Sequence, residues 1–314
     1  MTKPCPLCGG SNTNLHATAT DIEYFTSDQT FSYFRCQDCA VLFVAPMLHD
    51  RLSEIYPSNY YAFKPSDGGI VQRIKQWLDR RIFRSVLKQI PGANLAALDV
   101  GGGSGWLLDV VKQSDSRVTK TQVVDIDPGA RDAAISAGHG YFLGPIEDFE
   151  TTERFDLILM LNLIEHVRRP DQILAKARSL LTPDGLLLIK TPNYDALDAS
   201  LFRHRSWGGY HAPRHFVLFT RESFTQIAEK QGLAVQSFAY TQGAPFWAIS
   251  MANELRRMGL VKGSREKPLV YHPLIPLFQA AFAGFDLIRR PLARLSQMIF
   301  VMRIQASKYA GAAR

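Results

Sequence analysis

Cysteine is scarce in this sequence of 314 residues, and all four cysteines fall in two short pairs, CPLC at 5–8 and CQDC at 36–39. The first residues, MTKPCPLCGG, also lack the apolar core of a signal peptide, since prolines and polar residues stand in its place. No apolar run suits a membrane span, because the longest, in 272–295, is broken by proline, glycine and aspartate. We therefore expect a cytoplasmic protein, and peripheral contact with the inner face of a membrane stays open.

Two common nucleotide-binding loops are missing from the glycine-rich stretch LDVGGGSGWLLDV at 98–110. Read from Gly101 or from Gly103, the pattern G-x-G-x-x-G ends on Trp106 or Leu108, so a hydride-transfer site is not indicated. No Lys-Ser or Lys-Thr follows the glycines, so a P-loop is not indicated either. The stretch therefore serves another ligand or simply makes a tight turn.

The pattern that is present runs Asp99-x-Gly101-x-Gly103-x-Gly105, between a strand-like and a helix-like segment. Glycines without a Cβ atom let the backbone turn sharply and approach a ligand at the helix N-terminus. In such sites an acid about 20 residues further on, at the end of the next strand, holds the ribose hydroxyls. Asp125 stands there, with Asp127 as the alternative. Together these features indicate a nucleoside cofactor.

The two cysteine pairs fit a structural zinc site. Each C-x-x-C turn presents two thiolates, and Gly9 suits the first of these turns. Four cysteine ligands leave no open coordination position for water or substrate, so we do not expect a catalytic metal there. The segment 9–35 between the pairs is slightly longer than usual, and a redox pair or a chance arrangement is the alternative. The predicted ligands are Cys5, Cys8, Cys36 and Cys39.

Charge is unevenly distributed along the chain, whose formal net charge is +7. Residues 1–60 contain three basic and six acidic residues, whereas residues 251–314 contain eleven basic and three acidic residues. A module that grips RNA needs basic and aromatic side chains to neutralise phosphates. The acidic N-terminal module therefore argues against nucleic acid as the partner.

Strand-like and helix-like segments alternate from residue 95 onward. The apolar strands read as buried on both faces, which favours an α/β fold with a parallel sheet flanked by helices. The strand candidates are 95–100, 121–127, 155–161, 185–193, 234–240 and 296–304, and the helix candidates are 70–90, 105–113, 128–138, 170–181 and 221–233. We expect a zinc-ribbon module at 1–60, a linker and leading helix at 61–94, a main domain at 95–241 with 296–310, and a helical insertion or lid at 242–295. The linker composition itself, rich in Pro, Ser, Gly and Asn, extends over 57–69.

The successive stretches LDVGGGSG, VVDIDP, IEDF, FDLILMLNLIEHVRRP and PRHFVLFTRESFTQIAEKQGLAV carry a family resemblance. They resemble the motifs of class I S-adenosylmethionine (SAM)-dependent methyltransferases, in particular a bacterial group with an N-terminal two-knuckle zinc module. The resemblance covers residues 1 to about 240 and 296 to 306. It implies a Rossmann-like, seven-stranded methyltransferase sheet with an N-terminal zinc ribbon, and SAM as cofactor.

The resemblance also implies roles for particular residues at the cofactor site. Asp125 would hold the ribose hydroxyls with Ile126 beside it, Asp148 the adenine amino group, and Asn162 would border the methionine and the substrate. The methionine part would be lined by Asp99, Gly101, Gly103 and Gly105. One departure is the extra glycine, Gly102, where relatives carry a larger residue, and we expect it to make the loop laxer.

Methyl transfer from a sulfonium is an in-line displacement, so the enzyme mainly aligns the acceptor with the methyl group and excludes water. If the acceptor is a hydroxyl, a base must take its proton, and histidine suits that task. Glu165 and His166 follow one strand, and His211 and His215 lie in the stretch HRSWGGYHAPRHF that also holds His204. A structural role is the alternative for each, and His215 with Arg214 could instead bind an anion.

Some relatives place a divalent metal at Glu-x-x-Glu-His plus a distant histidine. Here Asn162 replaces the first acid, so we do not expect that site, because hard cations prefer carboxylate oxygens.

We expect a methyltransferase that acts on a hydroxyl of a small molecule, a sugar or polysaccharide, or a lipid-linked acceptor. An RNA methyltransferase and a non-catalytic relative that binds a nucleoside or a protein are the alternatives. The insertion reads as a lid over the acceptor, or as an amphipathic surface for an anionic membrane or lipid-linked substrate, with Phe278, Phe282, Phe285 and Leu292 on it.

Overall fold

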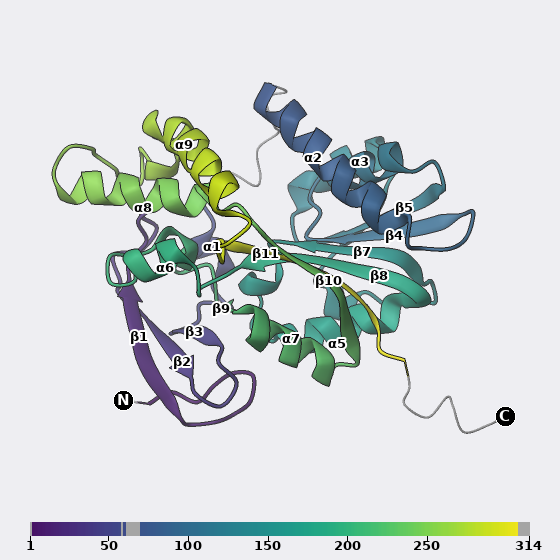
Figure 1. Ribbon diagram of the computed structural model, residues 1–314, viewed down its shortest axis with the longest axis horizontal. Helices are drawn as coiled ribbons and strands as arrows, with labels where there is room; N and C mark the ends of the chain where they lie inside the picture. Colours follow the sequence, from purple (N-terminus) through teal and green to yellow (C-terminus); the bar gives the residue numbers. More distant parts are fainter. Residues whose placement is uncertain (1, 58, 61–69, 307–314) are drawn as a thin grey trace.

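A computed structural model describes residues 2–57, 59, 60 and 70–306 of the chain (Figure 1). The linker predicted at 57–69 lies almost entirely outside the described residues. Two sheets organise the rest: a large sheet made by residues 95–304, and a small one at the N-terminus. A pair of helices lies above the small sheet in the view of Figure 1.

Within the described residues the large sheet has seven strands in the order β10-β11-β8-β7-β4-β5-β6. Their bounds are β4 Leu95–Val100, β5 Val118–Asp125, β6 Gly140–Leu143, β7 Phe155–Leu161, β8 Leu181–Pro192, β10 Leu233–Thr241 and β11 Gln297–Ile304. The strands from β8 to β6 in this order are parallel, whereas β11 runs antiparallel between β8 and β10. The predicted Rossmann-like sheet is confirmed, with β8 starting four residues before the predicted segment.

Helices cover both faces of the large sheet because its strands are apolar on both sides. Along β7, Leu157 and Leu159 face one core while Ile158 and Met160 face the other, as the period of two in a strand requires. The first core receives α2 (Ile70–Leu87), α3 (Trp106–Ser114) and α4 (Arg131–Ser136), and the second receives α5 (Pro170–Leu180) and α7 (Arg221–Lys230). The sequence predicted each of these helices.

The small sheet has the order β1-β2-β3-β9. It consists of β1 (Thr13–Ala19), β2 (Phe31–Cys36) and β3 (Leu42–Ala45), which α1 (Leu52–Ile55) follows, together with β9 (Val217–Leu218). The short strand β9 comes from far along the chain and pairs antiparallel with β3. The small sheet is therefore completed by a segment that the sequence pattern assigned to the main domain.

The insertion between β10 and β11 forms a helical hairpin of α8 (Ala244–Arg257) and α9 (Leu274–Arg289), as predicted. Trp247 of α8 stacks on Phe282 of α9 with ring centroids 4.9 Å apart and planes 11° apart. The buried carboxylate of Asp286 accepts a hydrogen bond of 2.9 Å from the backbone N–H of Gly243, at the start of α8. These contacts fix the two helices to each other.

The predicted amphipathic surface of α9 is wrong for two of its phenylalanines. Phe282 packs on Trp247, and Phe278 packs against a cluster that includes Ile22 and Ile249. Phe285 and Leu292, which the prediction also included, are exposed, and so are Leu277, Leu287 and Ile288. Among the described residues, none of the helices is both long and apolar enough to span a bilayer.

Candidate functional site

The glycine loop between β4 and α3 turns through a left-handed backbone at alternate residues. Gly105 is the N-cap of α3 with φ +79°, and a Cβ atom there would lie 2.4 Å from Cδ2 of His139. Gly103 has φ +52°, and a Cβ atom there would meet no atom within 4 Å. Glycine is thus required at 105 by packing, while the loop at Gly103 faces open space where a ligand can approach the backbone.

The extra glycine at 102 does not loosen this loop, so the expectation of a laxer loop is wrong. A Cβ atom on Gly102 would lie 2.7 Å from the carboxyl group of Asp99, which folds back against the loop. Burial, followed by the nearby charge of Asp125, raises the pKa of Asp99 well above its usual range. Among the described residues, Oδ2 of Asp99 has no hydrogen-bond partner. A buried acceptor of this kind beside an open loop fits a ligand that brings a donor, such as the ammonium group of SAM.

Asp125 stands at the end of β5, directly against the glycine loop. Its Oδ2 accepts a hydrogen bond of 2.7 Å from the Gly103 N–H, and its Oδ1 accepts one of 2.9 Å from the Asp127 N–H. Burial raises the pKa of Asp125. Asp127 instead accepts from the Gly129 N–H at 2.8 Å and caps a short 3-10 helix, Pro128–Ala130. Because Asp125 contacts the backbone of the glycine loop directly and Asp127 contacts the following helical turn instead, the geometry favours Asp125 over Asp127 for the ribose.

The remaining predicted cofactor residues follow the neighbouring strands. Ile126 is exposed just after β5, and Asp148 is exposed in a short 3-10 helix, Ile146–Asp148, after β6. Asn162 follows β7 with φ +57°, a region that asparagine tolerates, and its Oδ1 accepts from Nε2 of Gln297 at 3.2 Å. Since parallel strands end at one edge of a sheet, the predicted cofactor residues gather at the carboxyl edge of β4–β7.

Glu165 is fully buried in a 3-10 helix, Ile164–His166, that follows β7. Its Oε2 accepts a hydrogen bond of 3.0 Å from the Thr191 hydroxyl, and its Oε1 lies 4.0 Å from Nε2 of His215. Burial raises the pKa of Glu165 to about 8. This carboxyl group is therefore protonated at neutral pH, which disfavours the predicted catalytic role of Glu165 as a base.

The three predicted histidines lie together. The ring centroid of His215 is 4.6 Å from that of His166 and 4.9 Å from that of His211. Burial lowers the pKa of His166 to about 3 and that of His215 well below its usual value. Nδ1 of His215 donates to the Gly209 carbonyl at 2.8 Å, so its Nε2 carries the lone pair. His204 is exposed and outside this cluster.

The N-terminal module reaches this histidine cluster, which sequence reasoning did not anticipate. Oε1 of Glu23 lies 2.6 Å from Nδ1 of His211, and the Tyr60 hydroxyl lies 3.1 Å from Nε2 of the same ring. Next to this pair, Asp21 and Arg214 form a buried ion pair at 2.8 Å. No sequence signal links partners that are 151 residues apart or more. Two of the six acids that made residues 1–60 acidic are thus internal, and the module's surface is less acidic than its sequence.

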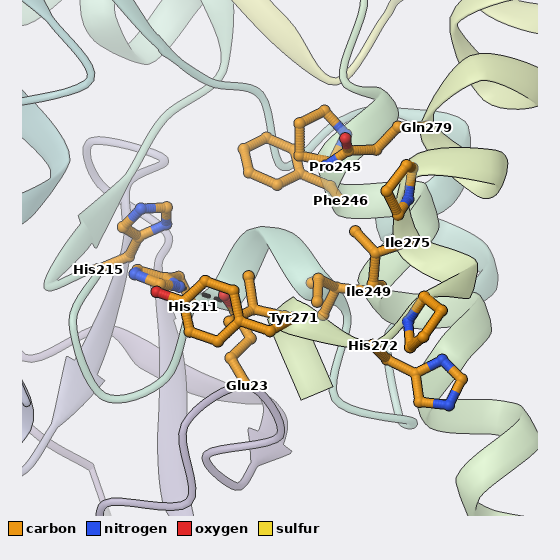
Figure 2. A pocket seen from close by; sticks show the side chains of 14 residues that line it. Glu23, His211, His215, Pro245, Phe246, Ile249, Tyr271, His272, Ile275 and Gln279 are labelled. Carbon is orange, nitrogen blue, oxygen red and sulfur yellow. Dashed lines mark hydrogen bonds and ion pairs between the residues drawn. The ribbon is translucent and has the colours of Figure 1, made fainter. Parts of the chain in front are cut away.

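A cavity of about 480 Å³ lies beside the histidines (Figure 2). His211, His215 and Glu23 stand on one side of it, and side chains of the insertion stand on the other. The apolar part of the lining comprises Pro245, Phe246, Ile249, Val270, Tyr271, Pro273, Ile275 and Pro276. The cavity therefore combines a mostly apolar wall with a polar end at the histidines and Glu23, while His272 and Gln279 add two polar side chains on the insertion side.

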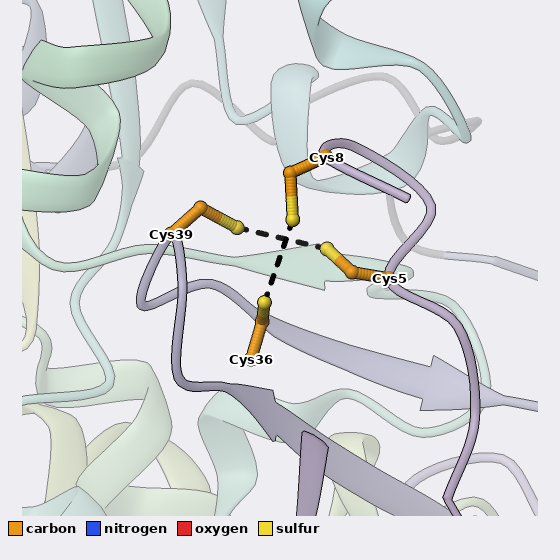
Figure 3. Close-up of side chains that lie close together, drawn as sticks. All are labelled: Cys5, Cys8, Cys36 and Cys39. Carbon is orange, nitrogen blue, oxygen red and sulfur yellow. Dashed lines mark hydrogen bonds between the residues drawn. The ribbon is translucent and has the colours of Figure 1, made fainter. Parts of the chain in front are cut away.

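The four cysteines converge as predicted (Figure 3). The sulfur of Cys5 lies 3.6 Å from that of Cys39, and the sulfur of Cys8 lies 3.5 Å from that of Cys36. Zn–S bonds of about 2.3 Å in a tetrahedron place sulfurs roughly 3.8 Å apart, so the cluster fits zinc. Gly9, with φ +72°, makes the first knuckle turn and donates its N–H to the Cys5 carbonyl.

Ligand atoms of Glu165, His166 and His215 also lie within 4.8 Å of one another. Nδ1 of His166 is already engaged by the Tyr56 hydroxyl and the Arg214 carbonyl, at 2.8 and 3.1 Å. Asn162, in the place of the first acid, is bonded to Gln297. This donor set is poor in carboxylate charge, and our expectation against a hard divalent cation there stays a prediction.

The order of the large sheet and the loop at its carboxyl edge define the class of Rossmann-like, SAM-dependent methyltransferases. Residues 72–237, more than half of the chain, match the model of a family described as a methyltransferase domain. The chain therefore belongs to this methyltransferase family. The match begins after the cysteine pairs, so it does not bear on the zinc module.

Individual relatives agree with this assignment. The ubiquinone biosynthesis O-methyltransferase of Bradyrhizobium sp. (strain ORS 278) is 25% identical over 168 residues, which are 47% of this chain and 64% of the relative. The protein of the same name from Nitrobacter winogradskyi is 30% identical over 185 residues, which are 53% of this chain and 68% of the relative. The chain thus spans less than two thirds of the first of these relatives.

Among solved structures, coclaurine N-methyltransferase bound to N-methylheliamine and SAH is similar with a TM-score of 0.50 and 15% identity. The similarity covers 79% of this chain and 78% of that chain. At this identity the comparison supports the fold alone.

Proposed function

We propose that this protein transfers the methyl group of SAM to a hydroxyl group of a small molecule whose body is apolar. The observation that carries the proposal is the cavity with an apolar wall and a histidine end. His215, which lines this cavity, has its Nε2 4.0 Å from Oε1 of Glu165, and Glu165 follows β7 at the carboxyl edge of the sheet. The O-directed chemistry is supported by the names of the relatives, which are O-methyltransferases of ubiquinone biosynthesis.

The residues at the carboxyl edge fit the cofactor. The Asp99 carboxyl would receive the ammonium of the methionine part, and Asp125 the ribose hydroxyls. Asp148 would contact the adenine, Ile126 would lie beside it, and Asn162 would border the methionine. When bound, SAM supplies an electrophilic methyl group, so the protein's own task is to align the acceptor and exclude water.

The lining of the cavity favours an apolar acceptor over a sugar. A sugar would place several hydroxyl groups against Phe246, Ile249 and Ile275, and each hydroxyl without a partner costs free energy. A hydroxyl at the polar end would instead lie beside His211 and His215, and His211 would take its proton. A lipid-linked or aromatic acceptor would place its apolar body against the apolar wall and its hydroxyl beside the histidines. Methyl transfer to a sugar or polysaccharide is the alternative result that the test can give.

Zinc, held by the four cysteines, would have a structural task in this function. It would close the two knuckles onto the small sheet and take no part in the chemistry, since no ligand position is open. Thiolate ligands of this kind persist in a reducing compartment, in keeping with a cytoplasmic location.

Peripheral contact with an anionic membrane would suit a lipid-linked acceptor. Leu287, Ile288 and Leu292 are 68%, 81% and 97% exposed, and Arg290 lies between them. Cosedimentation with phosphatidylglycerol vesicles tests this contact, and a Leu287→Ser/Ile288→Ser variant should bind the vesicles less. Equal binding to neutral phosphatidylcholine vesicles, or no binding, would contradict it.

Methyl-labelled SAM tests the proposed function directly. The purified protein is incubated with catechol, with catechol bearing a hexyl chain, with a sugar nucleotide, and with total RNA. Since each buried methylene contributes about 0.8 kcal/mol, we expect kcat/KM for the hexyl compound to exceed that for catechol more than tenfold. Label in the sugar nucleotide or in RNA, or in none of these while SAM still binds, would overturn the proposal.

A matched pair of variants locates the acceptor within the insertion. Phe246→Ala, in the cavity wall, should lower kcat/KM for the hexyl compound more than for catechol. Leu260→Ala changes an apolar residue of the same insertion that is 71% exposed and outside the cavity, and it should leave both values unchanged.

A further inference from the structure

We infer that Glu23 of the N-terminal module is a positioning residue for His211, so that the zinc-bearing module forms part of the acceptor site. This inference rests on the proposed function, because it assigns His211 the proton of the acceptor hydroxyl. The inference goes beyond the proposed function because Glu23 lies outside residues 72–237, which match the methyltransferase family, and yet would affect the rate of methyl transfer.

The geometry fixes where the proton of the His211 ring resides. A carboxylate only accepts hydrogen bonds, so the contact of 2.6 Å between Glu23 Oε1 and His211 Nδ1 places a hydrogen on Nδ1. The lone pair is then on Nε2, where the Tyr60 hydroxyl donates at 3.1 Å. An acceptor hydroxyl entering the cavity can make the same hydrogen bond in place of Tyr60. Glu23 thereby prepares His211 to take a proton through Nε2.

The chain around Glu23 is held so that its carboxylate has a defined position. Asp21 accepts hydrogen bonds from the backbone N–H groups of Glu23 and Tyr24, at 3.1 and 3.0 Å, and is itself paired with Arg214. Between them, Ile22 packs into the core of the insertion with Ile249. Glu23 is therefore held by Asp21, which binds Arg214 in the segment before β9, and by Ile22, which packs against the insertion. Both Glu23 and His211 are buried.

The neighbouring groups explain why a carboxylate is needed at this ring. His211 faces the rings of His166 and His215, at 6.0 and 4.9 Å, besides Glu23 and Tyr60. A proton taken up in this buried cluster needs a compensating negative charge, and among the described residues only Glu23 supplies one within hydrogen-bond distance of these rings. His215 has a neutral carbonyl at its Nδ1 instead, so it lacks that charge.

The test is a double-mutant cycle of Glu23→Gln and His211→Ala, with transfer of labelled methyl to the hexyl-bearing catechol as the readout. General base catalysis contributes about 10²–10⁴-fold, so we expect Glu23→Gln to lower kcat by 10- to 100-fold. Its SAM affinity and zinc content should match the wild type. Because Glu23 acts through His211, the double variant should be no slower than His211→Ala alone, within about threefold. Asp28→Asn, an exposed acid of the same segment, is the control and should leave kcat unchanged.

Two results would overturn the inference while leaving the proposed function intact: wild-type kcat in Glu23→Gln, or a double variant whose loss is the product of the two single losses. If Glu23→Gln loses zinc or SAM binding, Glu23→Asp replaces it in the cycle. Glu23→Asp keeps the negative charge, but its side chain is one methylene shorter, so the carboxylate lies farther from His211. This variant should also lower kcat. If the wild-type protein binds SAM but transfers labelled methyl to none of the test compounds, the proposed function is contradicted, and this inference fails with it.

Discussion

The ion pair between Asp21 and Arg214 joins the N-terminal module to the loop beside the cavity, and we predict that Asp21→Asn destabilises the protein by about 3 kcal/mol. Burial alone would raise the pKa of Asp21, but Arg214 outweighs it and lowers the pKa to about 2 from 3.8. At about 1.36 kcal/mol per unit, this shift corresponds to about 2.5 kcal/mol of stability. Removing one partner of a buried pair costs about 3–5 kcal/mol in other proteins, so the two figures agree.

The sign of the pH dependence follows from the lowered pKa. The contribution of Asp21 is fully present above pH 4, where the carboxylate is ionised in the folded and unfolded states alike. It is lost as the pH falls through about 2, where the folded carboxylate takes up its proton. The difference between wild type and Asp21→Asn should therefore be constant from pH 7 to 5 and shrink between pH 4 and 2.

Urea unfolding followed by tryptophan fluorescence measures this difference, with each variant compared to the wild type at the same pH and zinc concentration. Asp28→Asn removes an exposed charge from the same segment and should change the free energy of unfolding by less than about 0.5 kcal/mol. A loss below 1 kcal/mol in Asp21→Asn at pH 7, or a loss that stays constant down to pH 2, would refute the reasoning.

Three further variants test other parts of the structure. Cys36→Ser should reduce the zinc content, measured by atomic emission, from one per chain to near zero, whereas unchanged zinc would disprove the site. Asp125→Ala should weaken SAM binding in calorimetry by about 1–3 kcal/mol, and unchanged affinity would move the ribose role to Asp127. Glu165 has a pKa raised to about 8 from 4.5, so its stabilising effect is present below pH 4.5 and lost as the pH rises through 8. The buried histidines titrate alike in both proteins, so the stability of the wild type relative to Glu165→Gln should fall by about 4 kcal/mol from pH 5 to 8, and a difference that does not change with pH would contradict this.

Local patterns in the sequence predicted most of the fold and the cofactor edge. The apolar run before Asp99 and the glycines after it were sufficient to place a strand, a tight loop and a helix, because each signal acts within a few residues. The four-cysteine cluster was also predicted, because each pair of metal ligands is recognised by the short spacing between its two cysteines. Gly102 was misread because the need for glycine comes from the Asp99 side chain, which folds back across the loop.

The polar partners of the histidines could not be predicted in the same way. Glu23 and His211 are 188 residues apart and come into contact only in the folded protein. The sequence of residues 1–60 does not indicate which of its acidic side chains is buried. The face of α9 was also ambiguous, because that helix is apolar all round and its packing side is chosen by Trp247. Contacts between segments far apart in the sequence therefore determine which acid meets His211 and which face of α9 is buried, and the hydrophobic periodicity of the sequence does not reveal either.

The short strand β9 has a consequence for the order in which the protein is made. Strands β1 to β3 leave the ribosome well before β9, so the open edge of β3 finds its partner only when Val217 and Leu218 have been synthesised. At about 5–20 residues per second, that edge waits on the order of 10 to 30 s. An unpaired edge is a template for other strands during that time. The small sheet is thus begun early and completed only after most of the methyltransferase domain has been synthesised, so its integrity depends on that domain.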